Sequence, residues 1–445
     1  MPGQGGWPPA DSHATTDSPD GALRVDFVGR RGAVFWLALK TGFWAILTLG
    51  FYRFWMKTRL RRYFWSSIRP GGHPMEYVGD PWEKLLGFFI AVVILTFYIG
   101  VVNLILMFIS FSLFDGNVAG YFLSFLGVIP LWFYARYRAR RYVLGRTRWR
   151  GVRFGLEPGA WGYAWRACIH WLITLCTLGA LWPRMTFYLE KYRTDRTFFG
   201  SAKLVQGGRW TMLYRAAIPF ATTLALCGTW LLWVTLLQPI GPAFEMFLRG
   251  FVAGATGTEL DTTGIIFSPN VGLWRLWLLL PLTFALYYGV IHYIFGARRL
   301  MANHKTAPGI TFQSNLRTGR IAWIYAGGTT LAYLVLFLGL FLIALILLPL
   351  VGFDIFADVV TDTTGLDFDT PRWLTIAVSI ILYFGVFLLW SVVYNTFVTF
   401  PLMRHQAETT ALPTHDGLAQ VSQRARDEFA EAEGFAEALD LGAAI

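Results

Sequence analysis

The chain has 445 residues, of which 55% are hydrophobic and only 15% are charged, and its formal net charge is +11. A soluble protein carries about a quarter charged residues, and several apolar stretches here exceed the roughly 18 residues of a membrane-spanning helix. The composition therefore excludes an ordinary soluble protein and predicts an all-α integral membrane protein.

The two ends of the chain differ from its middle. Residues 1–23 are polar and rich in Gly, Pro and Asp, without the basic start and apolar core of a signal peptide, which predicts a disordered tail. Residues 24–410 hold the apolar stretches and form the predicted membrane domain. Residues 411–445 are acidic with apolar side chains near helical spacing. They predict an amphipathic C-terminal helix or tail that docks on the protein's own basic face.

Six apolar stretches are long enough to cross a membrane, at about residues 85–112, 119–135, 214–238, 275–297, 321–350 and 373–402. Lys and Arg gather in four of the connecting segments, 56–84, 135–160, 183–210 and 298–320, whereas acidic residues outnumber basic ones in 113–118, 239–271 and 352–372. Basic loops face the cytoplasm. We therefore expect both termini to lie in the cytoplasm. Because the basic residues lie next to predicted helix ends, we expect no nucleic-acid partner.

Two further apolar stretches, about 33–55 and 161–182, have a basic segment at both ends. If they crossed the membrane, alternate basic loops would be forced outside. We therefore expect re-entrant or interfacial helices that enter and leave on the cytoplasmic face. Both hold ionisable residues that lipid disfavours, Lys40 in the first and Arg166 and His170 in the second. The predicted fold is a six-span bundle with two re-entrant helices, and eight spans is the alternative.

Internal repeats support this arrangement. LTLGFYRFWMKTRLRRY (47–63) aligns without gaps on CTLGALWPRMTFYLEKY (176–192), and DTTGIIFSP (261–269) resembles DTTGLDFDTP (362–371). Self-similarity in a fixed order indicates repeated structural units. We predict three tandem helical hairpins, 85–135, 214–297 and 321–402, with a re-entrant element before each of the first two.

The first of these repeats also carries a resemblance to a known family. Its residues are Phe27, Gly29, Thr48, Leu49, Gly50, Tyr52, Trp55 and Tyr63. Over about residues 24–410 the chain resembles the YjgN family of bacterial inner-membrane proteins, which is also described as a domain of unknown function. The second repeat departs from this pattern at Leu181, Pro183 and Arg184. The resemblance implies a multi-pass protein of the bacterial inner membrane. It implies no activity, cofactor or catalytic residue.

We find no catalytic or metal-binding motif in the sequence. H-E-x-x-H, G-x-S-x-G and P-loop patterns are missing, so we expect no enzyme activity, cofactor or metal. An intramembrane enzyme acting on a lipid-linked substrate stays an alternative without a motif. The three cysteines lie in apolar segments without metal-ligand spacing. A cation site at Asp354, Asp358 and Asp362 is less favoured than a solvated loop.

Two functions fit these observations. The leading one is facilitated transport or permeation of a small solute, with an anion as one candidate, and with Lys40, Arg166 and His170 lining an inner gate. The alternative is a non-enzymatic scaffold that binds anionic lipid headgroups on the cytoplasmic face. Because Arg forms forked bonds with phosphate, the candidate headgroup contacts are Arg61, Arg62, Arg138, Arg140, Arg141, Arg298 and Arg299. Membrane lipids are the only expected partners, and no oligomeric state is predicted.

Overall fold

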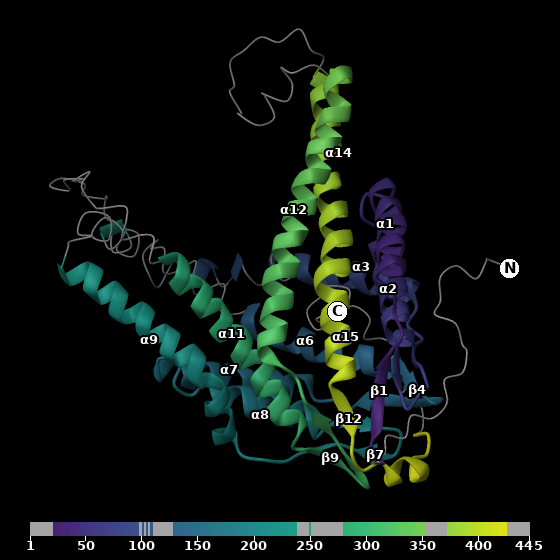
Figure 1. Cartoon of the computed structure of the whole chain (residues 1–445), viewed down its shortest axis with the longest axis vertical. Coiled ribbons are helices and arrows are strands. Elements are labelled where there is room, and N and C mark those ends of the chain that lie inside the picture. The colour runs from purple at the N-terminus through teal and green to yellow at the C-terminus, as the bar shows by residue number, and fades with distance from the viewer. Residues whose placement is uncertain are drawn as a thin grey trace.

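A computed structural model describes residues 21–97, 100–101, 104–105, 107–109, 128–237, 249–250, 279–351 and 372–424. Most of the described residues are helical, and the long helices rise from a base of short strands (Figure 1). The repeated Asp-Thr-Thr-Gly sequences and the three aspartates near residue 358 lie outside the described residues.

Four helices are long and apolar enough to cross a membrane, namely Trp210–Leu232, Leu279–Ala302, Thr318–Ile343 and Tyr383–Glu408. They coincide with the last four of the six predicted spans. The first two predicted spans, 85–112 and 119–135, are described only in part. Many apolar side chains of these four helices are exposed, as expected where lipid is the surrounding solvent. The helices place the protein in the helical membrane class.

Five consecutive units of one plan make up the described chain. Each unit begins with one or two strands, continues through two or three helices and ends with a strand. This last strand pairs antiparallel with the strand that precedes the unit's first helix. The first unit consists of β1 (Leu23–Phe27), α1 (Arg31–Leu47), α2 (Arg53–Ser67) and β2 (Ile68–Pro70). The third has the same short form, with β5 (Val152–Leu156), α7 (Ala160–Cys176), α8 (Trp182–Thr194) and β6 (Thr197–Phe199).

The other three units have a longer chain between their strands. The second consists of β3 (Met75–Tyr77), α3 (Pro81–Phe97), α6 (Val128–Gly145) and β4 (Thr147–Trp149). The fourth consists of β7 (Ala202–Lys203), β8 (Val205–Gln206), α9 (Tyr214–Leu237), α11 (Leu279–Ala302) and β9 (Lys305–Ala307). The fifth consists of β10 (Ile310–Thr311), β11 (Gln313–Ser314), α12 (Thr318–Val351), α14 (Arg372–Tyr394), α15 (Phe400–Glu408) and β12 (Thr410–Leu412).

The strands form three sheets, in the orders β11-β12-β1-β2, β3-β4-β5-β6-β7 and β10-β9-β8. We call the three sheets together the strand ring. Neighbouring units are joined by short turns, and β12 of the last unit pairs with β1 of the first. Apolar side chains from strands of all three sheets meet in one buried cluster that contains Leu23, Trp149, Phe199, Ile310 and Leu412. The sequence analysis did not predict these strands.

The two short units share the same turn between their helices. Gly50 and Gly179 donate their backbone N–H to the carbonyl five residues earlier, at 2.7 and 2.8 Å, and the preceding Leu49 and Leu178 have left-handed φ angles of 50° and 49°. This is the Schellman arrangement that ends a helix. The two Thr-Leu-Gly sequences therefore form equivalent structures, as their alignment predicts. The side chains of Leu49 and Leu178 are 75% and 94% exposed at these tips.

Residues 413–424 run across the strand ring. Leu418 and Val421 pack against its buried cluster, Ser201 donates its N–H to the Ser422 carbonyl at 2.9 Å, and the Arg424 guanidinium lies 4.1 Å from the centre of the Phe198 ring. The described part of the C-terminal stretch thus contacts residues 198–201 and the buried cluster of the strands. It includes a short 3₁₀ helix, Asp416–Gln420. Residues 425–445 lie outside the described residues, so the amphipathic C-terminal helix stays a prediction.

Candidate functional site

The five units place equivalent residues at the ends of their second helices. The final strands begin at Ile68, Thr147, Thr197, Lys305 and Thr410. Seven residues before these starts stand, in order, Arg61, Arg140, Glu190, Arg298 and Met403. The next residue is always a cation, in order Arg62, Arg141, Lys191, Arg299 and Arg404. These two positions therefore recur at the same distance from the final strand in every unit, near the end of the helix that precedes it, and most of them carry a charge.

Four of the five cations bind the backbone of the following unit. They are Arg62, Arg141, Lys191 and Arg299, which donate to the carbonyls of Gly79, Leu156, Gln206 and Leu316 at 2.8, 3.0, 2.8 and 3.2 Å. Each acceptor lies near the end of the strand that enters the next unit. The fifth cation, Arg404, pairs with Glu408 on its own helix instead. These cations therefore join neighbouring units.

The residue just before each of these cations contributes to a charge cluster in the second, third and fourth units. Glu190 of α8 forms a 2.6 Å ion pair with the Arg193 guanidinium and a 2.8 Å ion pair with Lys305 Nζ of β9. The Arg140 guanidinium of α6 lies 3.7 Å from the same carboxylate. The Glu190 carboxylate thus interacts with cations of α6, α8 and β9, the strand that follows α11.

Two more arginines extend this cluster. Arg298 of α11 is within electrostatic range of Glu190 and Arg140, and Arg136 of α6 is within range of Arg298. We call Arg136, Arg140, Glu190, Arg193, Arg298 and Lys305 the central charge cluster. Among these described side chains, five cations face one carboxylate, a formal excess of four positive charges. The side chains of Arg140 and Lys305 remain 31% and 21% exposed, so small solutes can reach them.

The cluster shifts the ionisation of its members. Burial acts to raise the pKa of Glu190, but Lys305, Arg193 and Arg140 outweigh it and hold this pKa well below its usual value. Burial acts to lower the pKa of Arg193, and the Glu190 charge outweighs it and raises that pKa. Burial lowers the pKa of Arg140, which gains less from the more distant carboxylate. Glu190 is therefore an ionised, permanent counter-ion at neutral pH.

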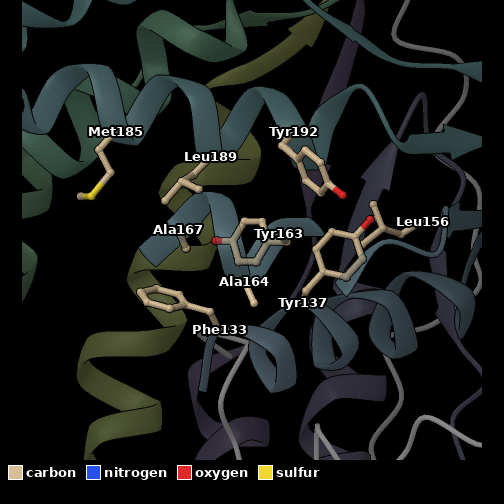
Figure 2. Close-up of a cluster of buried hydrophobic side chains, with 9 residues drawn as sticks. All are labelled: Phe133, Tyr137, Leu156, Tyr163, Ala164, Ala167, Met185, Leu189 and Tyr192. Carbon is tan, nitrogen blue, oxygen red and sulfur yellow. The ribbon is translucent and has the colours of Figure 1, made fainter. Parts of the chain in front are cut away.

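A tyrosine-rich apolar core holds the helices that carry the cluster. Tyr137, Tyr163 and Tyr192 from α6, α7 and α8 pack with ring centres 5.4 to 6.0 Å apart. Figure 2 shows them among the neighbouring side chains Phe133, Leu156, Ala164, Ala167, Met185 and Leu189. The Arg193 guanidinium lies 5.7 Å from the centre of the Tyr163 ring. The core thus fixes the distance between Arg140 on α6 and Glu190 on α8.

The three residues of the predicted inner gate lie on two different units. Arg166 and His170 are one turn apart on α7, where the Arg166 guanidinium covers the Tyr192 ring at 4.8 Å and the His170 ring stacks on Tyr188 at 5.5 Å. Lys40 is exposed on α1, which packs against α2 and α14. The structure brings Arg166 and His170 together and leaves Lys40 on the first unit.

The predicted lipid contacts divide into two groups. Arg61 and Arg141 are buried, at 3% and 7% exposed, and Arg61 donates to the Tyr77 hydroxyl at 3.2 Å. Arg138 likewise donates to the Tyr134 hydroxyl at 2.8 Å. Arg62 and Arg299 bind backbone carbonyls, as described above, while Arg140 and Arg298 belong to the central charge cluster. Most of these arginines therefore already contact the protein, and their binding of lipid stays a prediction.

The residues of the family motif hold the first unit together. The Tyr63 hydroxyl accepts the Arg30 N–H at 2.8 Å, the Phe27 ring packs edge-on against Phe400 at 5.3 Å, and Tyr52 stacks on Trp55 at 5.8 Å. A Cβ at Gly29 would lie 2.8 Å from the Phe27 ring, so a larger residue here would force that ring to move. Thr48, Leu49 and Gly50 form the exposed turn. The motif thus describes how this unit folds and contributes no charge to the cluster.

The sequence analysis missed Arg136, Glu190, Arg193 and Lys305 as site residues. A signal for Glu190 was present, because the gapless alignment of the Thr-Leu-Gly repeats sets it opposite Arg61. A carboxylate at a repeat position where three of the other four units have arginine indicates an acid that pairs with neighbouring cations. Within the described part of the chain, no group of three or more His, Cys, Asp and Glu side chains is placed to hold a metal ion.

Fold and site together define the class, a helical membrane protein made of repeated strand–helix–helix–strand units with a charge cluster at their helix ends. The chain belongs to the bacterial protein family of unknown function DUF898, whose sequence profile matches residues 22–438. This confirms the resemblance to the YjgN family, which is the same family, and the match extends beyond residue 410. No curated protein and no solved structure matches the chain.

Proposed function

We propose that this protein carries a small anionic solute across the bacterial inner membrane by facilitated transport or permeation. In this proposal six helices cross the bilayer, the two short units are re-entrant, and both termini lie in the cytoplasm. The observation that carries it is the central charge cluster, where five cations face one carboxylate among the described side chains. A local excess of positive charge attracts anions.

The dimensions of the short units support the re-entrant part of the proposal. α7 has 17 residues and α8 has 13, so the longer helix spans about 26 Å at roughly 1.5 Å per residue. A bilayer core is about 30 Å thick, and the base of each short unit is tied to the strand ring. The apolar tips at Leu49 and Leu178 suit insertion part of the way into lipid.

The gate residues fit the same path. Arg166 and His170 lie on α7, the helix whose Tyr163 contacts the charge cluster, and broken helices commonly line the sites of transporters. Apolar side chains fill the centre of the strand ring. An anion that reaches the cytoplasm must therefore leave beside the ring unless the ring opens.

Flux through reconstituted protein tests this function. Vesicles containing the full chain should take up radiolabelled phosphate, sulfate or acetate faster than empty vesicles. Arg298→Gln and Arg166→Gln should slow this uptake, because each removes a charge from the proposed path. Arg404→Gln is the matched control, because Arg404 is 58% exposed and pairs only with Glu408 among the described residues. Folded, correctly inserted protein that moves none of the three anions would contradict the proposal.

A lipid-binding scaffold is the second candidate, and the exposed apolar side chains of the two short units favour it. Phe43, Trp44 and Leu49 lie on the first unit, and Leu172 and Leu178 on the third, and all are at least half exposed or nearly so. Side chains of this kind anchor proteins at a membrane interface. Stabilisation by anionic lipid in the absence of flux would favour the scaffold over the transporter.

A further inference from the structure

We infer that the central charge cluster binds a phosphate group, or another tetrahedral oxyanion with two charges, in competition with Glu190. The inference names the ligand class for the site described above, and it rests on the proposed function only for its role in transport. While no ligand is bound, the Glu190 carboxylate pairs with the cations and holds them together.

The hydrogen-bonding capacity of the cluster exceeds what Glu190 can use. Arg193 and Lys305 take the two carboxylate oxygens at 2.6 and 2.8 Å, and the Arg140 guanidinium stays at 3.7 Å, beyond hydrogen-bond distance. The buried Nε of Arg193 has no hydrogen-bond partner among the described residues. Several donors therefore remain for a further acceptor.

The position of Arg298 is a second, independent observation that favours a bound anion. It is exposed, and its guanidinium lies 5.0 Å from the Phe295 ring without an ion pair to any described carboxylate. It nonetheless lies within electrostatic range of Glu190, Arg140 and Arg136. A cation that joins a positive cluster without an acid of its own raises the free energy of the protein. An anion bound between Arg298 and Arg140 would remove this cost.

The kind and arrangement of the donors select the ligand. Arg140, Arg193 and Arg298 come from three different helices, and Lys305 comes from a strand. Guanidinium groups form forked, two-bond contacts that match phosphate oxygens. Donors on several sides suit a tetrahedral anion better than a planar carboxylate, and two charges offset the formal excess of four better than one.

A phosphate group can come from free phosphate or from a lipid headgroup. The partial exposure of Arg140 and Lys305 and the open position of Arg298 allow either source. The two sources share the same chemistry at the cluster. They differ in whether the bound group is delivered from water or from the surrounding bilayer.

Binding of inorganic phosphate to the full-length protein in detergent tests the inference. Titration calorimetry at constant ionic strength should show phosphate binding, and chloride should not compete at equal charge. Arg140→Gln and Arg298→Gln should each weaken phosphate binding about tenfold, the loss expected for one charge-assisted hydrogen bond. Glu190→Gln should strengthen it at least severalfold, because the competing anion is gone. A merely structural role for Glu190 would lower stability without tightening phosphate binding.

Controls separate the remaining outcomes. Arg404→Gln should bind phosphate like the unchanged protein. Wild-type affinity in both Arg140→Gln and Arg298→Gln, or no phosphate binding at all, would overturn the inference. Displacement of phosphate by nanodiscs of phosphatidylglycerol, but not of phosphatidylcholine, would support the site with lipid as the source. Cluster-dependent phosphate binding without vesicle uptake would support the site and remove transport as its purpose.

Discussion

Glu190 of α8 occupies the position that Arg61 occupies in α2, seven residues before the strand that ends its unit. Arg61 is buried against Tyr77 and Trp65, whereas Glu190 faces Arg193, Lys305 and Arg140. The repeat thus keeps its backbone plan and reverses one charge. Without this reversal, the second, third and fourth units would each place an arginine at this position.

Removal of that charge should destabilise the protein. Glu190→Gln leaves Arg193, Lys305 and Arg140 without their shared carboxylate. Breaking a fully buried ion pair costs roughly 3–5 kcal/mol, and because this cluster is partly exposed we expect about 2 kcal/mol. The midpoint of thermal unfolding in detergent, followed by tryptophan fluorescence, measures the effect. Glu408→Gln, which breaks the exposed pair with Arg404, should change stability by less than about 0.5 kcal/mol.

The depressed pKa of Glu190 predicts how this difference depends on pH. A carboxylate whose pKa is lower in the folded state than its ordinary value of 4.5 contributes stability above that value. The contribution is lost as the pH falls through the folded pKa. The difference in unfolding midpoint between the unchanged protein and Glu190→Gln should therefore be constant from pH 8 to about pH 5 and shrink below about pH 4. A difference that shrinks near pH 7 would contradict the assignment.

Loss of a cation that joins two units should also destabilise the protein. Arg141→Met keeps most of the side-chain volume but leaves the Leu156 carbonyl without its 3.0 Å bond from Arg141 Nε. A buried acceptor without a partner costs about 1–3 kcal/mol. We expect a lower unfolding midpoint for Arg141→Met and little change for Arg404→Met, whose side chain is 58% exposed. Equal effects of the two changes would contradict a joining role for Arg141.

Thiol labelling in intact cells should establish the topology. In a background with all three native cysteines replaced, single cysteines at Arg150, Ser201 and Asp362 are probed with a membrane-impermeant reagent. Arg150 and Ser201 are exposed on turns of the strand ring, so both should react only after the cells are permeabilised. Asp362 should react in intact cells. Labelling of Ser201 in intact cells would mean that the third unit crosses the membrane.

The sequence predicted the helices and repeats because their signals are local. The four apolar helices follow from run length, and the Thr-Leu-Gly turns follow from a gapless alignment over 17 residues. The strands have only two to five residues each, too few for a period of two to stand out. They form because distant segments pair, as when Leu23 of β1 pairs with Leu412 of β12.

The site was predicted only in part for a similar reason. Arg140 and Arg298 were singled out as arginines at helix ends, and their assignment to lipid did not include Glu190. Lys305 and Glu190 are 115 residues apart, and only the strand ring brings them to 2.8 Å. Charge counting along the sequence shows which residues are available, but it cannot show which of them share a counter-ion.

The pairing of β12 with β1 also determines when the fold can be completed during synthesis. Leu412 follows Leu23 by 389 residues (412 − 23), so at roughly 5–20 residues per second the first strand waits about 20–80 s for its partner. During that time the helices can be inserted one after another, while the β1 edge that pairs with β12 stays open as a seam. A ribosome that stops early would leave this seam exposed, and the cell's proteases could recognise the unfinished product by it.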